Sequence, residues 1–493
     1  MRHGTGKMRI AAIMDTLTRE CYGPECDLLE LTPYGWKREL TDFRPEIVLV
    51  ESAWFGKDSL WQSRLDRYSA EMAGIAAWCR KHEVPLVYWG KEDPVHMARF
   101  LPTAYWADVV FTTAAECIGA YKKLLGHRQV YHLHFAAQPR LHNPIESLGR
   151  LDRCCFAGAY YADFPDRCRV FEELAGYLSE AKGLDIYDRF AGKATPLNIF
   201  PEKFQPYILG HLAPADIGRA YKGYMYNLNL NSITDSQTMF SRRVFELMAS
   251  NTVVISNKSS GMEKYFGRSI ISADNAEELR GKLASCCDTE EKLARFRLHA
   301  LRQVAREHLY EDRLSFIVSK VFGGKQKIWQ PKVCVFSRVN SREEEERVRR
   351  MFEKQRYDEK ELIFLNGSLP EYEGSYDYDY LAYFHPQDWY GGNYLLDLVL
   401  AMRFGEFDAV GKGAYFAGGG SEAVLRGKGQ EYHYVASLPA RRCIFKPSML
   451  KNNSLCVETK FENGNVLSVD YFNYCQNWQD EFCYMAEDNK ENY

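Results

Sequence analysis

In residues 8–145, short apolar runs alternate with longer segments in which apolar side chains recur about every 3.6 positions, as in Trp61–His82. The short runs predict buried strands, and the periodic segments predict amphipathic helices. Strands that alternate with helices in this way are typical of a parallel, doubly wound sheet. The predicted strands of this region are Arg9–Met14, Ile47–Glu51, Leu86–Tyr88 and Val109–Thr112.

The alternation begins again near residue 150, after the turn-forming residues His142-Asn143-Pro144. Residues 167–181 predict a helix, and residues 288–323 predict one or two long helices that close the second unit. The sequence therefore predicts a second Rossmann-like unit in tandem with the first, with a ligand-binding cleft between them. The predicted strands here are Arg153–Ala157, Leu184–Ile186, Asn227–Leu230, Thr252–Ser256 and Ser269–Ile271.

A third pattern follows the polar segment at 323–327. Lys332–Ser337 and Glu361–Leu365 predict strands, and the charged segment Arg342–Lys354 predicts a helix. The tail after Asn452 has weak periodicity, and we predict no element in it. A chain of 493 residues is too long for one hydrophobic core and indicates about three domains. The predicted domains are residues 8–145, 146–325 and 326–493.

The composition narrows the class of protein. Hydrophobic residues are 46%, charged residues are 26% and the net charge is −3, which is ordinary for a soluble globular protein and gives no basic footprint for nucleic acid. No apolar run approaches the ~18 residues of a membrane helix, and the N-terminal MRHGTGK lacks the apolar region of a signal peptide. The 14 cysteines form no CxxC pair, and the adjacent pairs Cys154–Cys155 and Cys286–Cys287 suit neither ordinary disulfides nor zinc. These features predict a cytoplasmic protein with reduced thiols.

The stretch at 232–256 carries more polar chemistry than a helix and a strand require. We predict a helix over Met239–Ala249, because Phe240 and Val244 begin an apolar stripe of helical spacing there. Ser236 and Thr238 would then stand at the N-terminus of this helix, where free N–H groups and hydroxyls suit a diphosphate.

Three charged residues of this helix complete the predicted nucleotide site. Arg242 and Arg243 would lie near the phosphates, and Glu246 would lie further along the helix to accept both hydroxyls of a ribose. The alternative is a surface ion pair between Glu246 and either arginine, which would contribute little to stability. A glycine after the first strand of this unit and nearby cations would also suit phosphates. These further candidates are Gly158, Arg167, Arg189 and Lys222.

Polar residues also follow a strand of the first unit, at the carboxyl end where ligands of parallel sheets bind. Glu92 and His96 could supply a general base or orient an acceptor hydroxyl. Asp93 offers the same chemistry, but the Asp93-Pro94 pair also fits the start of a helix, with the aspartate as N-cap, and we favour that interpretation.

Glu51 and Trp54 follow the neighbouring strand and should reach the same edge of the sheet. Trp54 could stack on an acceptor sugar or pack into the core. No G-x-G-x-x-G follows the first strand, which argues against a dinucleotide-binding oxidoreductase. His132 and His134 share one face of a strand, but they lack a third ligand, so we predict packed histidines and no metal site.

The segment at 238–254 resembles the signature of the C-terminal domain of GT-B glycosyltransferases, a helix with E-x7-E followed by A-x-G-x-P-V-V. Glu246 occupies the second Glu, which binds the ribose in that family, whereas Thr238, Asn251 and Val253 replace the first Glu, the Gly and the Pro. A closer resemblance is to the CgeB-like family of glycosyltransferases, related to a spore maturation protein. It covers roughly residues 8–275 and implies a two-domain GT-B fold and a nucleotide-sugar donor. It rests on ESAWFGK (51–57), YWGKEDPVH (88–96), FTTAAECIGAYKKLLGH (111–127), CFAGAYY (155–161) and SITDSQTMFSRRVFEL (232–247).

The third segment resembles parts of a GT-A family 2 glycosyltransferase, in FEKQRYDEKELIFLNG (352–367) and YFHPQDWYGGNYLLDLVLA (383–401). Asp388 alone remains of the acidic cluster that binds the metal in that family. One carboxylate is a poor site for Mg²⁺ or Mn²⁺. The resemblance therefore implies a degenerate, non-catalytic domain for acceptor binding or assembly.

Together these features predict an α/β protein with a GT-B-like fold that transfers a sugar from a nucleotide-sugar, with UDP as the default nucleotide, to a hydroxyl of a glycan, protein or cell-surface acceptor. No metal or other cofactor is expected, and retention of configuration is slightly favoured by the resemblance. The first domain would present the acceptor and the second would bind the donor; oligomerisation is left open. The alternatives are a non-catalytic sugar- or nucleotide-binding scaffold and a nucleotide-sugar epimerase.

Overall fold

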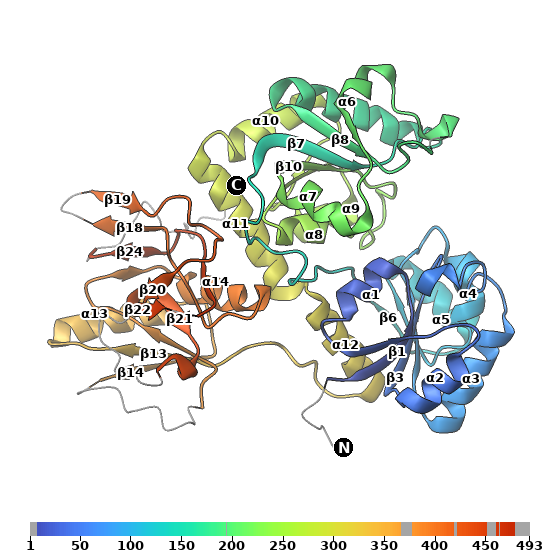
Figure 1. Ribbon diagram of the computed structural model, residues 1–493, viewed down its shortest axis with the longest axis horizontal. Coiled ribbons are helices and arrows are strands. Elements are labelled where there is room, and N and C mark those ends of the chain that lie inside the picture. The colour runs from blue at the N-terminus through green and yellow to red at the C-terminus, as the bar shows by residue number, and fades with distance from the viewer. Residues whose placement is uncertain are drawn as a thin grey trace. The chain divides into compact units, whose positions relative to one another are not determined.

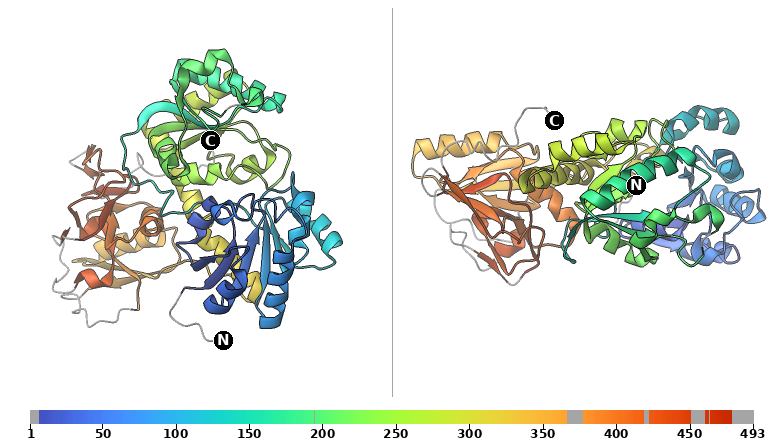
Figure 2. Two further views of the ribbon diagram at one scale, coloured as in Figure 1. Left: turned by 45° about the vertical axis from the view of Figure 1, so that its right-hand side comes forward. Right: turned by 90° about the horizontal axis from the view of Figure 1, so that it is seen from above.

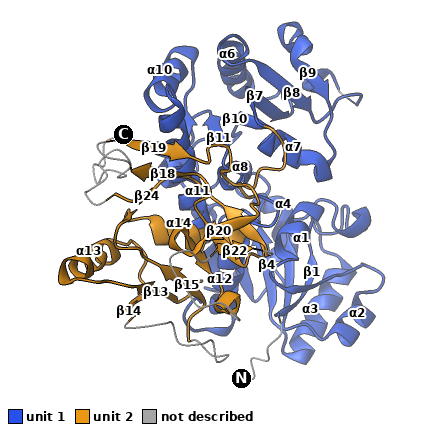
Figure 3. Cartoon of the chain, turned by 60° about the vertical axis from the view of Figure 1, so that its left-hand side comes forward, with its two compact units in different colours: residues 1–142, 150–328 blue, residues 143–149, 329–493 orange. Residues whose placement is uncertain are grey.

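The computed structural model describes residues 7–193, 195–365, 377–418, 422–450, 460–462 and 464–478. The chain forms two compact units, one of residues 1–142 with 150–328 and one of residues 143–149 with 329–493 (Figure 3). Predictions that concern residues 1–6 or the tail after 478 lie outside the described residues. Figure 1 labels the elements, and Figure 2 shows the same ribbon from two further sides.

The first sheet of the larger unit has six parallel strands in the order β2-β1-β3-β4-β5-β6. Alternate residues of β1 enter different apolar clusters, Ile10 on one face of the sheet and Ala11 on the other, so both faces are covered. The strands are β1 Arg9–Ile13, β2 Asp27–Glu30, β3 Ile47–Glu51, β4 Leu86–Gly90, β5 Val109–Thr112 and β6 Val130–His132. The helices are α1 Thr16–Tyr22, α2 Trp36–Phe43, α3 Ala70–His82, α4 Met97–Ala104 and α5 Ile118–Leu125.

The second sheet of this unit also has six parallel strands, in the order β12-β11-β10-β7-β8-β9. Counted within this domain the order is that of the Rossmann fold, and the chain leaves in opposite directions from the neighbours β7 and β10. The strands are β7 Leu151–Gly158, β8 Leu184–Asp188, β9 Ile208–Gly210, β10 Tyr224–Asn229, β11 Val253–Ser256 and β12 Ile271–Ser272. The helices are α6 Pro165–Ala181, α7 Ile217–Lys222, α8 Arg243–Ala249, α9 Ser260–Phe266, α10 Ala276–Cys286, α11 Glu290–Glu307 and α12 Tyr310–Phe322.

The two sheets share one apolar core, because α12 returns from the second domain to the first (Figure 1). Ala137 donates its N–H to the carbonyl of His308 at 2.9 Å and accepts one from Tyr310 at 3.1 Å. The rings of Tyr22 and Tyr310 then meet edge to face with their centroids 4.9 Å apart. Helix α12 therefore packs beside α1 on the first sheet, whereas α8 packs on β10 and β11 of the second sheet.

The smaller unit holds mixed sheets. Its main sheet runs β14-β13-β15-β21-β17-β23, in which β21 is antiparallel to both of its neighbours, and Glu146 joins this unit by donating its N–H to the carbonyl of Tyr432 at 2.9 Å. The main strands are β13 Val333–Ser337, β14 Lys360–Phe364, β15 Tyr380–Tyr383, β17 Ala409–Gly411, β21 Cys443–Phe445 and β23 Val466–Ser468. The other strands are β16 Trp389–Tyr390, β18 Tyr415–Gly418, β19 Ala423–Arg426, β20 Ser437–Pro439, β22 Lys460–Glu462 and β24 Tyr474–Gln476, and the helices are α13 Arg342–Glu353 and α14 Tyr394–Ala401.

The predicted fold class is confirmed: two Rossmann-like parallel-sheet domains in tandem, followed by an α/β region. Every predicted strand is present, with ends that differ by at most three residues. The helix predicted over Trp61–His82 begins only at α3, where Ser69 caps it by accepting the N–H of Met72. Trp61 is buried in the preceding loop and donates to the carbonyl of Leu31. It therefore fits the apolar period because it is buried, although it does not belong to the helix. Within the described residues, no helix combines the length and apolarity needed to cross a bilayer.

Candidate functional site

The carboxyl end of the second sheet is where a Rossmann-like domain binds its ligand, beside the point at which the strand order reverses. That point lies between β7 and β10. Strand β7 ends at Gly158, whose carbonyl accepts the N–H of Arg189 at 2.8 Å across from the end of β8. Gly158 and Arg189 therefore stand together at this edge.

Three arginines converge beside Gly158. The guanidinium of Arg167, on the first turn of α6, donates two hydrogen bonds of 3.2 Å to the carbonyl of Ala159, while its buried Nε has no partner. Burial lowers the pKa of Arg167, and the positive charges of Arg243 and Arg189 lower it further. Arg167 therefore lies within electrostatic range of both Arg189 and Arg243. No carboxylate in the described part of the chain forms an ion pair with any of them.

Arg243 reaches this cluster from a different element. It is the first residue of α8 and is half-buried, and α8 begins there and not at Met239 as predicted. The prediction was wrong because Ser236 forms a local turn: its hydroxyl accepts the N–H of Met239 at 2.9 Å. Such side-chain bonds compete with helix formation.

Thr238 is not part of a phosphate site in this structure. Its hydroxyl accepts the N–H of Ala115 at 2.8 Å and donates to the carbonyl of Thr113 at 2.9 Å, in the loop after β5. Ser236 and Thr238 are both buried, so the predicted helix N-terminus with free N–H groups is absent there. Thr238 instead connects the second domain to the first.

Glu246 lies in a buried polar cluster. Its carboxylate accepts from Tyr221 Oη at 2.8 Å and forms an ion pair with Arg242, and only 2% of the residue is exposed. Burial would raise the pKa of Glu246, but Arg242, His142 and the tyrosine hydroxyl together hold it below its usual value. The alternative prediction of an ion pair between Glu246 and Arg242 is thus confirmed as to its partners but not as to its place on the surface, because the carboxylate is buried and only Arg242 stays partly exposed. Lys222 belongs to this cluster, because its charge helps lower the pKa of the buried His142.

The first sheet has its own reversal point, between β1 and β3, and a buried ion network fills it. Lys91 Nζ lies 2.9 Å from both Asp15 Oδ2 and Glu51 Oε1. Asp15 also accepts the N–H groups of Trp54, Phe55 and Gly56 and so fixes the loop after β3. Glu51 is fully buried, and burial raises its pKa against the effect of Lys91. The prediction that Glu51 contacts an acceptor is therefore wrong.

Asp93 is neither a helix cap nor accessible to a substrate. It is 1% exposed and accepts from Thr112 Oγ1 at 2.6 Å and Tyr121 Oη at 3.1 Å, and burial raises its pKa to about 6. The Asp93-Pro94 peptide is cis, and the N-cap of α4 is His96. The cap prediction failed because the carboxylate points into the core, where it accepts hydrogen bonds from Thr112 of β5 and Tyr121 of α5.

Glu92, Trp54 and His96 remain half-buried at this edge. The ring of His96 meets Trp54 edge to face at 5.1 Å, and the guanidinium of Arg99 lies 4.7 Å from the centroid of the same indole. The backbone N–H of Glu92 donates to Ser52 Oγ at 3.1 Å, which fixes the loop that carries it. These three side chains therefore stay partly accessible at this edge.

The histidines and the third domain show packing in place of metal binding. Among the described residues, no group of three or more His, Cys, Asp or Glu is placed to hold a metal ion. His134 packs against Phe240 and Tyr265. Asp388 is fully buried and binds Arg441, Tyr474 Oη at 2.7 Å and the N–H of Asn477 at 2.8 Å, so both of its oxygens are engaged.

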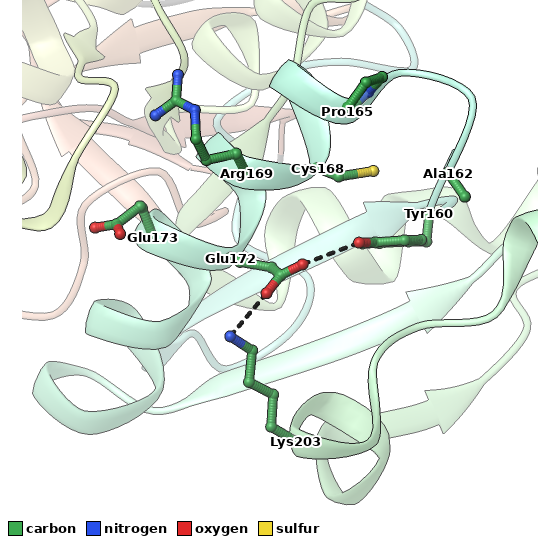
Figure 4. Close-up of a pocket in the computed structure, with 8 residues that line it drawn as sticks. All are labelled: Tyr160, Ala162, Pro165, Cys168, Arg169, Glu172, Glu173 and Lys203. Carbon is green, nitrogen blue, oxygen red and sulfur yellow. Dashed lines mark hydrogen bonds and ion pairs between the residues drawn. The ribbon is translucent and has the colours of Figure 1, made fainter.

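A separate pocket of about 470 Å³ lies along the outer face of α6 (Figure 4). Glu172 accepts from Tyr160 Oη at 3.0 Å and pairs with Lys203 at 2.8 Å, and that lysine chiefly lowers the pKa of Glu172. Arg169 and Cys168 also line it. Glu172 and Lys203 are thus paired with each other, and none of Arg167, Arg189 and Arg243 lines this pocket.

Sequence reasoning missed Asp15, Lys91 and Tyr221. Asp15 and Lys91 each come directly after an apolar strand, so the rule that led to Glu51 and Glu92 would have found them. Tyr221 gives no such signal, because a tyrosine at the end of a short helix is ordinary in a sequence.

Residues 177–319 match the model of a family described as glycosyl transferase-like, and this segment carries Arg189, Arg243 and Glu246. No curated protein matches the chain. The CgeB-like and GT-A resemblances therefore stay predictions.

Three solved structures are similar at a distance. A candidate UDP-N-acetylglucosamine 2-epimerase from Listeria monocytogenes is 11% identical with a TM-score of 0.40, over 65% of this chain and 98% of that one. An alpha-glucosyltransferase solved with UDP-glucose and abasic DNA is 11% identical with a TM-score of 0.43, over 64% and 90%. A glycosyltransferase from Rickettsia africae is 12% identical with a TM-score of 0.40, over 64% and 91%. Similarity at this level does not say what this chain binds or transforms.

Proposed function

We propose that this chain is a glycosyltransferase that binds the diphosphate of a nucleotide-sugar through Arg167, Arg189 and Arg243. The observation that carries the proposal is the placement of Arg167 and Arg189 at the carboxyl end of a Rossmann-like sheet, where they donate to the carbonyls of Ala159 and Gly158. Arg243 lies within electrostatic range of Arg167, and within the described residues no carboxylate forms an ion pair with any of the three. Cations that lie close together repel one another, and a bound anion with two or more charges removes that cost. The match of residues 177–319 to a glycosyl transferase-like family supports a sugar nucleotide as that anion.

The arginines also suit the chemistry of transfer. The bond between the anomeric carbon and the diphosphate oxygen breaks, and the acceptor oxygen forms a new bond to that carbon. Negative charge then develops on the leaving diphosphate, where guanidinium groups donate paired hydrogen bonds and stabilise it. In this proposal the arginines do the work that a metal ion does in other transferases, and no cofactor is needed.

Glu246 is proposed to bind the ribose. Arg242 holds its carboxylate in the ionised form, which accepts hydrogen bonds. Tyr221 and Arg242 engage the two carboxylate oxygens and Glu246 is 2% exposed, so this role requires that the side chain of Tyr221 moves aside and a ribose hydroxyl replaces its hydrogen bond. UDP is the proposed default nucleotide, and retention of configuration stays an expectation from the resemblance.

The first domain is proposed to present the acceptor near Trp54, Glu92 and His96. Trp54 offers a ring face or edge to a sugar, and Glu92 or His96 would take the proton from the acceptor hydroxyl. Asp93 is too deeply buried for this role. Glycan, protein and cell-surface hydroxyls all fit this chemistry.

The test is a screen of UDP-, GDP-, dTDP-, ADP- and CMP-sugars for thermal stabilisation and for release of free nucleotide. Wild type should be stabilised by one nucleotide family and should release that nucleotide slowly. Arg243→Ala should bind it roughly 30-fold more weakly, since a hydrogen bond to a charged group contributes about 2 kcal/mol. Arg169→Ala is the matched control, because Arg169 is exposed on α6 two positions after Arg167 and lines the other pocket.

Each other outcome has a clear meaning. Equal loss in both variants, or no stabilisation by any nucleotide, would refute the phosphate site. Binding without release, even with candidate acceptors, would favour a scaffold. Conversion of the sugar nucleotide in the absence of an acceptor would favour an epimerase.

A further inference from the structure

Cys286 and Cys287 are the described cysteines that are not buried. Every other described cysteine is buried, and for most of them burial raises the pKa of the thiol. Thiol reagents reach exposed sulfur atoms and react with the thiolate form. Accessibility therefore singles out this adjacent pair.

The end of α10 brings the two thiols together. Adjacent side chains on a continuing helix diverge and do not face each other. Cys286 is the last residue of α10, and Cys287 leaves the helix with φ −137° and ψ 20°. The two Sγ atoms consequently lie 3.4 Å apart, and Cys286 Sγ also lies 3.0 Å from the carbonyl of Lys282.

The other adjacent pair in the chain shows that this arrangement is specific. Cys154 and Cys155 lie within strand β7, where successive side chains point to opposite faces of the sheet. Their thiols accordingly enter two different apolar clusters, and both residues are fully buried. Adjacency in the sequence alone therefore does not make a thiol pair.

The surroundings distinguish the two sulfur atoms. The hydrogen bond from the Cys287 thiol lowers the pKa of Cys286, and Lys292 acts in the same direction. Either thiol can be the donor in the contact between the two sulfur atoms, and Cys286 also donates to the carbonyl of Lys282. The pKa of Cys287 is raised by the same contact, so the difference between the two thiols favours Cys286 as the more reactive sulfur.

We infer that Cys286 and Cys287 form a reactive dithiol that is modified by small disulfides, with Cys286 as the attacking sulfur. The Cys286 thiolate attacks one sulfur of a low-molecular-weight disulfide such as oxidised glutathione; the disulfide S–S bond breaks, a mixed disulfide forms on Cys286, and the other half leaves as a thiolate. The mixed disulfide persists, because closing a disulfide between neighbours requires Cα atoms closer than ordinary disulfides allow. A small thiol reverses the reaction.

This site is independent of the proposed donor site. Lys182, which acts on Cys287, immediately precedes β8, and the thiols also act on the phenol of Tyr226 within β10. The dithiol therefore lies toward the amino ends of these strands, whereas Gly158 and Arg189 lie at the carboxyl ends. Modification of the pair does not require an empty nucleotide site.

The experiment uses the full chain with Cys456→Ser and Cys483→Ser, because these two cysteines lie outside the described residues. Oxidised glutathione is added, and intact mass and peptide mapping follow the modification. We expect one glutathionyl group per chain, on Cys286. Cys287→Ala should slow the reaction roughly tenfold, since loss of the hydrogen bond returns the pKa of Cys286 toward its ordinary value, and Cys286→Ser should abolish it.

A second measurement tests the pairing of the sulfur atoms. Phenylarsine oxide condenses with two neighbouring thiols: two arsenic–sulfur bonds form, and the oxide oxygen leaves as water with the two thiol protons. It should bind the parent protein once and neither single variant. Label on other cysteines of the folded parent, an unchanged rate in Cys286→Ser, or failure of the folded parent to bind the arsenical would each overturn the inference. Peptide mapping of the parent decides the question even if a variant fails to fold.

Discussion

Replacement of His134 by leucine should make the protein less sensitive to mild acid. His134 lies on the segment after β6, is 8% exposed and packs with Phe240, Tyr265 and His308 in the apolar core that the two domains share. Its Nε2 is buried without a partner. Burial lowers the pKa of His134 far below the ordinary value, and His132 and Arg313 add to the effect.

The sign of the pH dependence follows from proton binding. A lowered pKa in the folded state means that the unfolded chain takes up a proton below about pH 6.5 while the native histidine stays neutral. The free energy of unfolding therefore falls as pH decreases below 6.5, by about 1.4 kcal/mol per pH unit for each such histidine. Between pH 7.5 and 5.0, His134 should account for a loss of about 2 kcal/mol.

The neighbours behave in the same way. Burial lowers the pKa of His132 to about 4 and that of His308 to about 3, so both add to the acid sensitivity of the wild type over this range. Asp93 acts in the opposite sense, because its raised pKa of about 6 makes the native state bind a proton first. The comparison of wild type with His134→Leu cancels these contributions and isolates one group.

The assay is urea unfolding followed by circular dichroism at pH 7.5, 6.5, 5.5 and 5.0. The matched control is His82→Gln, since His82 is exposed at the end of α3. We expect wild type and control to lose about 2 kcal/mol more than His134→Leu between the first and last pH. Equal losses in all three proteins would refute the argument that His134 is buried in the neutral form.

Two other substitutions test the polar contacts of the larger unit. Thr238→Val should lower the free energy of unfolding by about 2 kcal/mol in urea titrations, because it leaves the N–H of Ala115 and the carbonyl of Thr113 unpaired; the exposed Thr41→Val should change it by less than about 0.5 kcal/mol. Lys91→Met should cost about 3–5 kcal/mol at pH 8 because Glu51 loses its buried partner, and the cost should shrink at pH 5 as Glu51 takes up a proton. A cost for Lys91→Met that does not change with pH would contradict the buried ion network.

The sequence predicts strands better than it predicts the polar loops around them. Strands β3, β4 and β5 are continuous apolar runs because both faces of their sheet are covered, and such runs are easy to read. Strand β2, with the sequence DLLE, was missed because it lies at the edge of the sheet and is only partly buried. The start of α8 was misplaced because Ser236 bonds to nearby backbone, which a helical apolar period does not reveal.

The sequence likewise predicts some features of the candidate site and not others. Arg167 and Arg189 could be named because they follow predicted strands, whose carboxyl ends a parallel sheet brings together. Arg243 could be named from its place on the predicted helix over Met239–Ala249. The sequence could not show that these arginines lack carboxylate partners, because ion pairing depends on which side chains lie beside them in the folded chain. Asp93 shows the converse: its Asp-Pro sequence fits a cap, yet Thr112 and Tyr121 draw the carboxylate into the core.

Each of the two parallel sheets has a reversal point of its strand order, where ligands of such sheets bind, but the charges at the two points differ. This difference supports the proposal that the second domain binds the nucleotide. At the reversal point of the first sheet, Lys91 is neutralised by Asp15 and Glu51 from the chain itself, so that position has no charge left to offer a ligand. At the reversal point of the second sheet, neither Arg167 nor Arg243 forms an ion pair with a carboxylate of the described residues, although Arg243 is close enough to Glu246 to help lower its pKa. A diphosphate supplies the missing negative charge at the second position and would meet Asp15 and Glu51 at the first. The proposed function therefore places the anionic donor at the second domain and an uncharged acceptor hydroxyl at the first.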